Sequence, residues 1–133
     1  LNASRGGVVD NAAMRQSDHP YYFDVWEGEP EIASDILQCA SLATPHVAGY
    51  SEQGKANASA MVIRALAREF DLPLKEWYPS EVTPTTPRSI SWQEVLASID
   101  NYYPITEESI KLKRTPEDFE RMRNSYIYRK EYF

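Results

Sequence analysis

The sequence predicts an α/β fold for its first half, followed by a proline-rich arm and a small, mostly helical unit. Over the first fifty residues, short apolar or aromatic runs alternate with short helical patterns. A long helical pattern then covers residues 51–70, and four prolines fall within residues 72–89. Strands that alternate with helices are typical of a parallel sheet. We therefore expect the first fifty residues to form the end of a parallel α/β sheet.

The composition limits the class of protein. The chain has 133 residues, 42% of them hydrophobic, enough for one ordinary domain or a piece of a larger one. A net charge of -6 without clustered lysine and arginine argues against a nucleic-acid surface. No signal peptide is recognisable, and no apolar run approaches the roughly 20 residues of a membrane span. The single cysteine, Cys39, cannot form an internal disulfide. We expect a cytoplasmic protein that binds neither nucleic acid nor membrane.

Turn residues and hydrophobic periodicity place the elements of the first half. His19-Pro20 separates the first helix from the strand that follows it. The predicted elements are, in chain order, a strand end running into a glycine turn over residues 1–7, a helix over 8–14 entered through Asp10 or Asn11, a strand over 21–25, a helix over 34–38 and a strand near 41–43.

The helical pattern over residues 51–70 is the longest in the chain. Glu52 lies in its first turn, where a carboxylate complements the helix dipole. Apolar residues repeat at three- and four-residue spacing, which predicts a buried stripe. The stripe consists of Ala56, Ala60, Ile63, Ala67 and Phe70.

Residues 72–90 are rich in proline, threonine, serine and glutamate, and are predicted to form a linker or extended arm. Beyond the arm, capping patterns predict three helix starts, at Ser91 with Glu94, at Thr106, and at Thr115-Pro116. So many aromatic side chains on so small a unit must pack on its own domain or on a partner subunit. They are Trp77, Tyr78, Trp92, Tyr102, Tyr103, Phe119, Tyr126, Tyr128, Tyr132 and Phe133.

Four charged or titratable residues fall at the predicted strand ends or in the turns after them. In open α/β sheets, ligands bind beyond the carboxyl ends of the strands, so these residues could converge on one cleft. A histidine with a carboxylate partner suits acid/base catalysis, and an arginine suits a substrate carboxylate. Taken singly, each is more simply a residue of a surface turn. The four residues are Arg5, Asp24, Glu29 and His46.

The same residues belong to short motifs that follow one another along the chain. These motifs are Asn2-Ala3-Ser4-Arg5-Gly6, Val9-Asp10, Asp24-Val25-Trp26 with Glu29-Pro30, and Thr44-Pro45-His46. In order and approximate spacing they resemble the C-terminal signature of the NAD-dependent D-2-hydroxyacid dehydrogenases. Gly49-Tyr50, Gly54-Lys55 and residues 119–126 are most similar to family members that act on a small phosphorylated 2-hydroxy acid.

The resemblance implies a catalytic role for three residues. Arg5 would bind the substrate carboxylate and polarise the reacting carbon. His46 would exchange the hydroxyl proton, and Glu29 would hydrogen-bond His46 and raise its basicity. No metal is implied.

The resemblance also implies contacts with NAD and with the substrate. Asp24 would hold the nicotinamide carboxamide, and Tyr50 would contact the phosphorylated substrate. The remaining NAD contacts would come from Ala3, Ser4, Arg5 and Gly49. Glu27, which lies between Asp24 and Glu29, receives no role.

The fold class implied by the resemblance is α/β, a C-terminal piece of a Rossmann-like nucleotide-binding domain followed by a small, mostly helical α+β dimerisation domain. The expected division is 1–71 for the NAD-binding and catalytic part, 72–90 for the arm and 91–133 for the domain that forms a homodimer through residues 72–133. No Gly-x-Gly-x-x-Gly motif occurs in the chain. We therefore expect the substrate domain and the first half of the nucleotide fold to precede Leu1, and the chain alone to be inactive.

The segment between Asp10 and Asp24 departs from the family pattern. It has only thirteen residues and is shorter than is usual in the family. The strand that bears Asp24 could therefore enter the sheet at a different angle.

Other interpretations stay open at this point. The chain could be a non-catalytic binding and dimerisation module, or part of another D-2-hydroxyacid dehydrogenase, since the catalytic residues are shared within the family. A serine hydrolase using Ser4 and His46 is a distant third, because Ser4 lacks the Gly-x-Ser-x-Gly turn.

Overall fold

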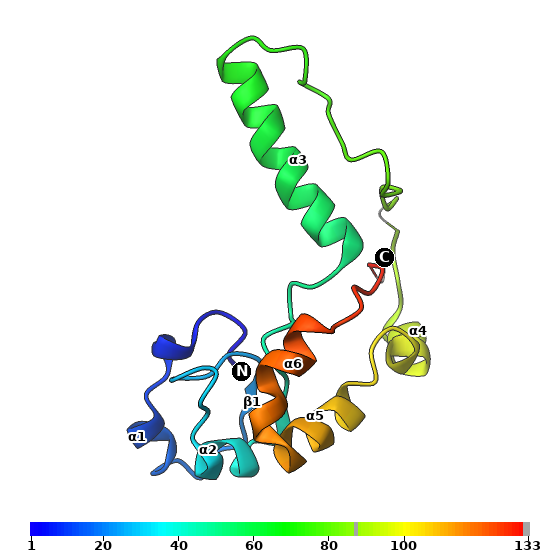
Figure 1. The fold of residues 1–133 in the computed structure, drawn as a ribbon. Coiled ribbons are helices and arrows are strands. Elements are labelled where there is room, and N and C mark those ends of the chain that lie inside the picture. The colour runs from blue at the N-terminus through cyan, green and yellow to red at the C-terminus, as the bar shows by residue number, and fades with distance from the viewer. Residues whose placement is uncertain (87, 132–133) are drawn as a thin grey trace. The chain divides into compact units, whose positions relative to one another are not determined.

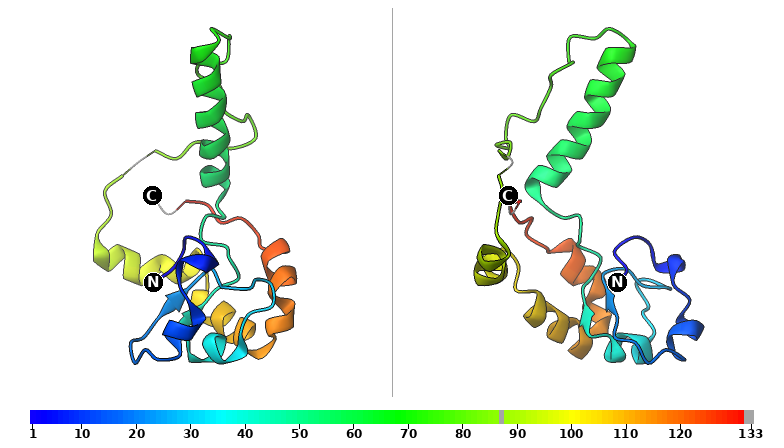
Figure 2. Two further views of the ribbon diagram at one scale, coloured as in Figure 1. Left: turned by 90° about the vertical axis from the view of Figure 1, so that its left-hand side faces the viewer. Right: turned by 180° about the vertical axis from the view of Figure 1, so that it is seen from behind.

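The computed structural model describes residues 1–86 and 88–131 (Figures 1 and 2). Its contacts divide the chain into two compact units, which are described separately. The first unit consists of Leu1–Ala48 and Pro104–Ile127, and the second of Gly49–Tyr103 with the chain from Tyr128 on. Within the described residues, no helix is long and apolar enough to cross a membrane.

The first unit contains a small parallel sheet. Strands β1 (Tyr22–Phe23) and β2 (Leu42–Ala43) pair in parallel with Phe23 opposite Ala43, and Asn2 forms a parallel bridge to Phe23 on the other side. The predicted parallel pairing is confirmed, although each strand is shorter than expected. The helical segments of this part are η1 (Gly6–Val8), α1 (Asn11–Met14) and α2 (Ser34–Cys39). The Asp10 carboxylate caps α1 by accepting the Ala12 N–H, as predicted.

Helices from the end of the chain complete the core of the first unit. These are α5 (Ile105–Arg114), η3 (Pro116–Asp118) and α6 (Phe119–Asn124), which follow one another in Figure 1. The Ser109 hydroxyl accepts the Ala43 N–H at 2.9 Å, so α5 is tied directly to β2. The buried core consists of Tyr21, Phe23, Trp26, Ile36, Leu37, Ala40, Ala43, Leu112, Phe119 and Met122.

The second unit is built on the long helix α3 (Glu52–Glu69). Ser51 caps its start by accepting the Gly54 N–H at 2.9 Å. The arm then turns back toward the start of α3, as both views of Figure 2 show. Side chains of α3 hold the returning chain, because Gln53 Nε2 donates to the Thr83 carbonyl and Arg64 Nε to the Trp77 carbonyl.

Two short helical segments follow the arm, α4 (Trp92–Ser98) and η2 (Ile99–Asn101). The predicted cap at Ser91 is confirmed, since its hydroxyl accepts the Glu94 N–H at 3.2 Å. The predicted cap at Thr106 is wrong. Helix α5 already begins at Ile105, and no side-chain cap precedes it.

The stripe predicted on α3 is confirmed for its alanines and wrong at its end. Ala56, Ala60 and Ala67 are buried, whereas Phe70 is 67% exposed. Phe70 is the residue at which α3 ends, so it no longer follows the helical periodicity. The second unit also exposes other large apolar side chains: Met61, Val62, Leu66, Leu72, Leu74, Trp92, Leu96, Ile99, Tyr102 and Tyr128.

The two contact-defined units differ from the division predicted at residues 71 and 90. Helix α3 groups with the arm, and residues 104–127 group with the N-terminal segment. Phe119 is buried in the first unit, while Tyr132 and Phe133 lie outside the described residues. The functional division into 1–71, 72–90 and 91–133 stays a prediction.

Candidate functional site

The predicted partners His46 and Glu29 lie together in the first unit. His46 follows β2 and Glu29 lies in the turn after β1, and His46 Nδ1 is 2.7 Å from Glu29 Oε2. The two side chains are partly accessible, with exposed fractions of 24% and 19%. A proton on Nδ1 is donated to the carboxylate, which leaves Nε2 as the nitrogen that can take a proton from a ligand.

The turn that carries His46 is held by Asp24. The Asp24 carbonyl accepts the His46 N–H at 2.8 Å, and its carboxylate oxygens accept the N–H groups of Val47 at 2.9 Å and Ala48 at 3.0 Å. Thr44 Oγ1 donates to the same carboxylate at 2.6 Å. His46 adopts a left-handed backbone conformation with φ 59°, which is uncommon for a residue other than glycine. These bonds stabilise that conformation.

The Asp24 carboxylate therefore has hydrogen-bond partners that the sequence did not indicate. Asp24 is 7% exposed, and both of its carboxylate oxygens accept bonds from the turn after β2. The partners lie 20 or more residues away in the chain, so no local motif indicated them. Contact with the nicotinamide carboxamide stays a prediction for this residue.

Glu27, for which the sequence indicated no role, also has a partner. Its carboxylate accepts the Asn11 N–H at 2.9 Å, at the start of α1. A carboxylate there satisfies a free helical N–H and complements the helix dipole. Thus Glu29 binds the ring of His46, the Asp24 carboxylate binds the turn around it, and Glu27 binds the start of α1.

Arg5 lies in the loop that leaves the sheet after the bridge at Asn2. Its side chain is exposed, and Nη1 donates to the Ser4 carbonyl at 2.7 Å. Because Asn2, Phe23 and Ala43 are neighbours in parallel register, the segments with Arg5, Asp24 and His46 leave the sheet at the same edge. Ala3 and Ser4, predicted to contact NAD, are exposed in the same loop.

Gly6 allows this loop to approach the chain after β1. A Cβ atom at residue 6 would lie 1.9 Å from the Trp26 carbonyl oxygen and 2.8 Å from the Glu27 nitrogen. Such distances exclude any side chain without movement of the backbone. The Arg5–Gly6 peptide therefore packs directly on the segment that leads to Glu29.

Gly49 and Tyr50, the other predicted ligand contacts, fall in the second unit. The Tyr50 ring packs edge-on against Tyr128, with ring centroids 5.5 Å apart, and Lys55 Nζ lies 4.2 Å from the centroid of the Tyr50 ring. Arg129 Nη1 donates to the Tyr50 carbonyl at 3.0 Å. The residues after α6 thus hold the start of α3, a contact that the sequence did not indicate.

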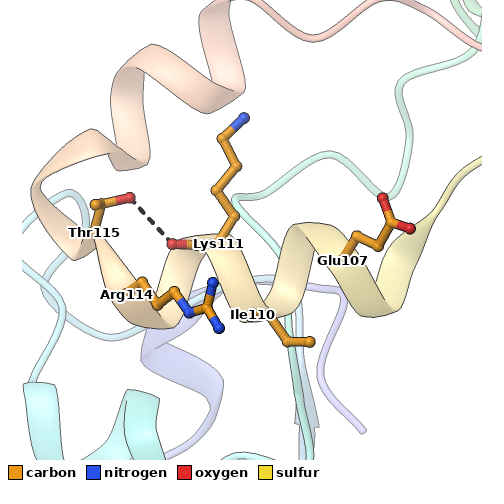
Figure 3. A pocket seen from close by; sticks show the side chains of 5 residues that line it. All are labelled: Glu107, Ile110, Lys111, Arg114 and Thr115. Atoms are coloured by element: carbon orange, nitrogen blue, oxygen red, sulfur yellow. Dashed lines mark hydrogen bonds between the residues drawn. The ribbon is translucent and has the colours of Figure 1, made fainter.

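A surface hollow of about 400 Å³ on α5 contains none of the predicted site residues. Figure 3 shows its lining, in which the Lys111 and Ile110 side chains point to opposite sides of the helix and the Thr115 hydroxyl donates to the Lys111 carbonyl. In the described part of the chain, no group of three or more His, Cys, Asp and Glu side chains is arranged to hold a metal ion.

A histidine bound to a carboxylate at the carboxyl edge of a parallel sheet is chemically suited to acid/base catalysis. No family model matches the chain. The chain is 36% identical to an erythronate-4-phosphate dehydrogenase of Bacteroides thetaiotaomicron, over 98% of this chain and 38% of that protein. It is 34% identical to the enzyme of that name from Teredinibacter turnerae, over 99% of this chain and 40% of that protein. It is 33% identical to the one from Edwardsiella ictaluri, over 99% of this chain and 39% of that protein.

The chain belongs to the erythronate-4-phosphate dehydrogenase family, as a C-terminal part of such a protein. It spans about two fifths of the length of the curated relatives that it matches.

Proposed function

We propose that the parent protein oxidises 4-phospho-D-erythronate to 2-oxo-3-hydroxy-4-phosphobutanoate with NAD, a step of pyridoxal phosphate (vitamin B6) biosynthesis. The observation that supports this most directly is the His46–Glu29 pair, with 2.7 Å between Nδ1 and Oε2. The names of the relatives supply the substrate, a phosphorylated 2-hydroxy acid.

Each site residue takes one part of the reaction. His46 accepts the proton of the C2 hydroxyl at Nε2, while the hydrogen on C2 leaves as hydride. Arg5 binds the substrate carboxylate through two parallel hydrogen bonds and polarises the reacting carbon. Glu29 holds the ring of His46 and favours the imidazolium that forms. Tyr50 contacts the phosphorylated end of the substrate.

NAD, when bound, accepts the hydride. The residues present fit part of this cofactor, because Ala3, Ser4 and Gly49 are exposed and accessible to a ligand. Asp24 lies at the same sheet edge, but its buried carboxylate already accepts bonds from Thr44, Val47 and Ala48, so its contact with the carboxamide is proposed on the resemblance alone. Since the 133 residues contain no Gly-x-Gly-x-x-Gly motif, the pyrophosphate must bind elsewhere in the parent protein. We therefore expect the chain alone to be inactive.

The function is tested in the full-length protein by following NADH formation from 4-phospho-D-erythronate. Replacing His46 by alanine removes the proton acceptor, and we expect kcat to fall by roughly 10²- to 10⁴-fold with NAD affinity nearly unchanged. His19→Ala is the matched control, because His19 is the other histidine of the chain and is exposed. Full activity of the His46 variant would exclude this mechanism.

Another D-2-hydroxyacid dehydrogenase activity remains the nearest alternative. The same assay with unphosphorylated D-2-hydroxy acids distinguishes the two, since a phosphate-specific site discriminates strongly against substrates that lack the group. Equal kcat/KM values for both kinds of substrate would favour the alternative.

A dimerisation role is the second candidate for this chain. The exposed apolar side chains of the second unit support it, because burying apolar surface favours association. In this proposal, residues 1–71 complete a Rossmann-like nucleotide-binding domain, the arm 72–90 follows, and 91–133 form the dimerisation domain of a cytoplasmic homodimer.

A further inference from the structure

Asn2 is a buried polar residue with no role in the proposed reaction. It is only 5% exposed, although asparagine is mostly found at protein surfaces. Its N–H donates to the Tyr22 carbonyl at 3.0 Å, and its carbonyl accepts the Asp24 N–H at 2.9 Å. Strand β1 therefore fixes the backbone of Asn2, including the Cα atom from which the side chain extends.

Both ends of the Asn2 amide bind the loop that follows. Oδ1 accepts the Ser4 N–H at 3.2 Å, and Nδ2 donates to the Arg5 carbonyl at 3.0 Å. A primary amide offers an acceptor and a donor from one short planar group. Asparagine uses both here to close the turn from residue 2 to residue 5.

The backbone of Arg5 is consequently fixed while its side chain is accessible. The Arg5 carbonyl accepts a second bond, from the Val8 N–H at 3.1 Å, and the Arg5 backbone is extended with φ −145° and ψ 148°. On the other side, Gly6 packs on the Trp26 carbonyl. The guanidinium is exposed beyond this ordered backbone. A charged group on a prearranged backbone loses less entropy when it binds its ligand.

We propose that Asn2 is a positioning residue for Arg5, whose guanidinium it places to meet the substrate carboxylate. The proposal rests on the proposed function, because it is that function which gives Arg5 a substrate to bind. Asn2 itself touches neither substrate nor cofactor in this scheme. It acts through the backbone of Ser4 and Arg5.

The first test is a double-mutant cycle in the full-length protein. Asn2→Asp keeps the size of the side chain and the acceptor for Ser4, but an ionised carboxylate cannot donate to the Arg5 carbonyl. We expect kcat/KM for 4-phospho-D-erythronate to fall by roughly ten- to a hundredfold, as for other small misplacements of a binding group. Once Arg5 has been replaced by alanine, the same Asn2 change should have almost no further effect. Independent effects, which multiply in the double variant, would overturn the proposal.

The second test needs no turnover. A crystal structure of the Asn2→Asp protein should show residues 4–5 displaced while β1 and β2 keep their places, and an unmoved Arg5 backbone would overturn the proposal. If the wild-type protein does not turn over the substrate, the proposed function is wrong, and the crystal structure alone tests whether Asn2 positions the Arg5 backbone. Should the aspartate variant not fold, Asn2→Ser replaces it in both tests, because serine also lacks the amide that bridges Ser4 and Arg5.

Discussion

The two oxygens of the Glu29 carboxylate bind different groups. Oε1 accepts the Trp26 N–H at 2.6 Å within its own turn, and Oε2 lies 2.7 Å from His46 Nδ1. The first bond orients the carboxylate before any substrate arrives, so the second needs no rearrangement during the reaction. Such preorganised groups stabilise a charge that develops in the transition state.

Replacing Glu29 by glutamine tests this role in the full-length protein. The amide has nearly the same shape but no charge, so it no longer favours the imidazolium form of His46. We expect kcat/KM for 4-phospho-D-erythronate to fall roughly tenfold or more, because the charge that develops on His46 loses its oriented partner. Glu27→Gln is the control, because Glu27 binds the start of α1 instead. An unchanged kcat/KM in the Glu29 variant would remove Glu29 from the mechanism.

Gly6 is the second residue whose environment predicts a measurable effect. Gly6→Ala would place a Cβ atom 1.9 Å from the Trp26 carbonyl oxygen, so the backbone must move. We expect a loss of about 1–3 kcal/mol in the free energy of unfolding, measured by urea denaturation of the full-length protein. At the adjacent Gly7 a Cβ would meet nothing within 4 Å, so Gly7→Ala should cost far less. Equal losses for both variants would contradict the close packing at Gly6.

At the level of single residues, the sequence predicted the His46–Glu29 pair but not what surrounds it. The pair was recognisable because both residues belong to motifs that resemble a known family. The contacts of Asp24 and Glu27 join segments 16 to 24 residues apart, and the preference of an acid for a turn does not reveal which turn it binds.

At the level of elements, the bounds of the helices were predicted better than those of the strands. Helix α2 and helix α3 were found nearly to the residue, because Ser51 is a cap and the alanines of α3 keep helical spacing. The strands are short because the backbone carbonyls just beyond them have other partners: the Thr44 carbonyl accepts the Trp26 indole N–H, and the Asp24 carbonyl accepts the His46 N–H. Thr106 failed as a predicted cap because α5 is already helical at Ile105.

A residue just beyond the C-terminal end of α3 has a left-handed backbone conformation, which is unfavourable for a residue other than glycine. Asp71 has φ 49°, and the Leu72 N–H donates to the Ala67 carbonyl at 2.8 Å, which is the closing bond of a helix end that usually carries glycine. Asp71→Gly should therefore raise the free energy of unfolding by up to about 1 kcal/mol. The measurement is urea denaturation of the full-length protein.

The control for this variant separates the effect of the backbone conformation on stability from the effect of an ion pair. Lys75 Nζ bonds the exposed Asp71 carboxylate, and exposed pairs contribute little. Lys75→Ala removes the pair alone and should change stability only slightly. A destabilised Asp71→Gly protein would show that the aspartate side chain outweighs the backbone strain.

For the whole chain, the sequence did not reveal that its last third contributes to both compact units. Residues 104–127 complete the core of the first unit with Leu112, Phe119 and Met122, and Tyr128 and Arg129 hold the start of α3. These contacts join segments separated by more than 60 residues. Hydrophobic periodicity shows that a helix has an apolar face, but not which distant surface covers it.

This arrangement determines how the proposed dimer should be tested. Deleting residues 72–133 would remove three core residues of the first unit, so aggregation of that variant would not be informative. Point changes on α4 avoid the difficulty, because Trp92 is 80% and Leu96 76% exposed and neither is needed for the core of the chain. Aromatic side chains at the centre of an interface often contribute about 2 kcal/mol or more to binding.

We expect Trp92→Ala with Leu96→Ala to convert the full-length protein from a dimer to a folded monomer, because the two apolar side chains would lose their place in a two-fold interface. Light scattering over a dilution series measures the molecular mass, and circular dichroism checks that the fold is intact. Val8→Ala serves as the control, since Val8 is an exposed apolar residue of the first unit. If the α4 variant is still a dimer at the lowest concentration, α4 does not contribute to the interface, and the exposed face of α3 with Met61, Val62 and Leu66 becomes the next surface to change.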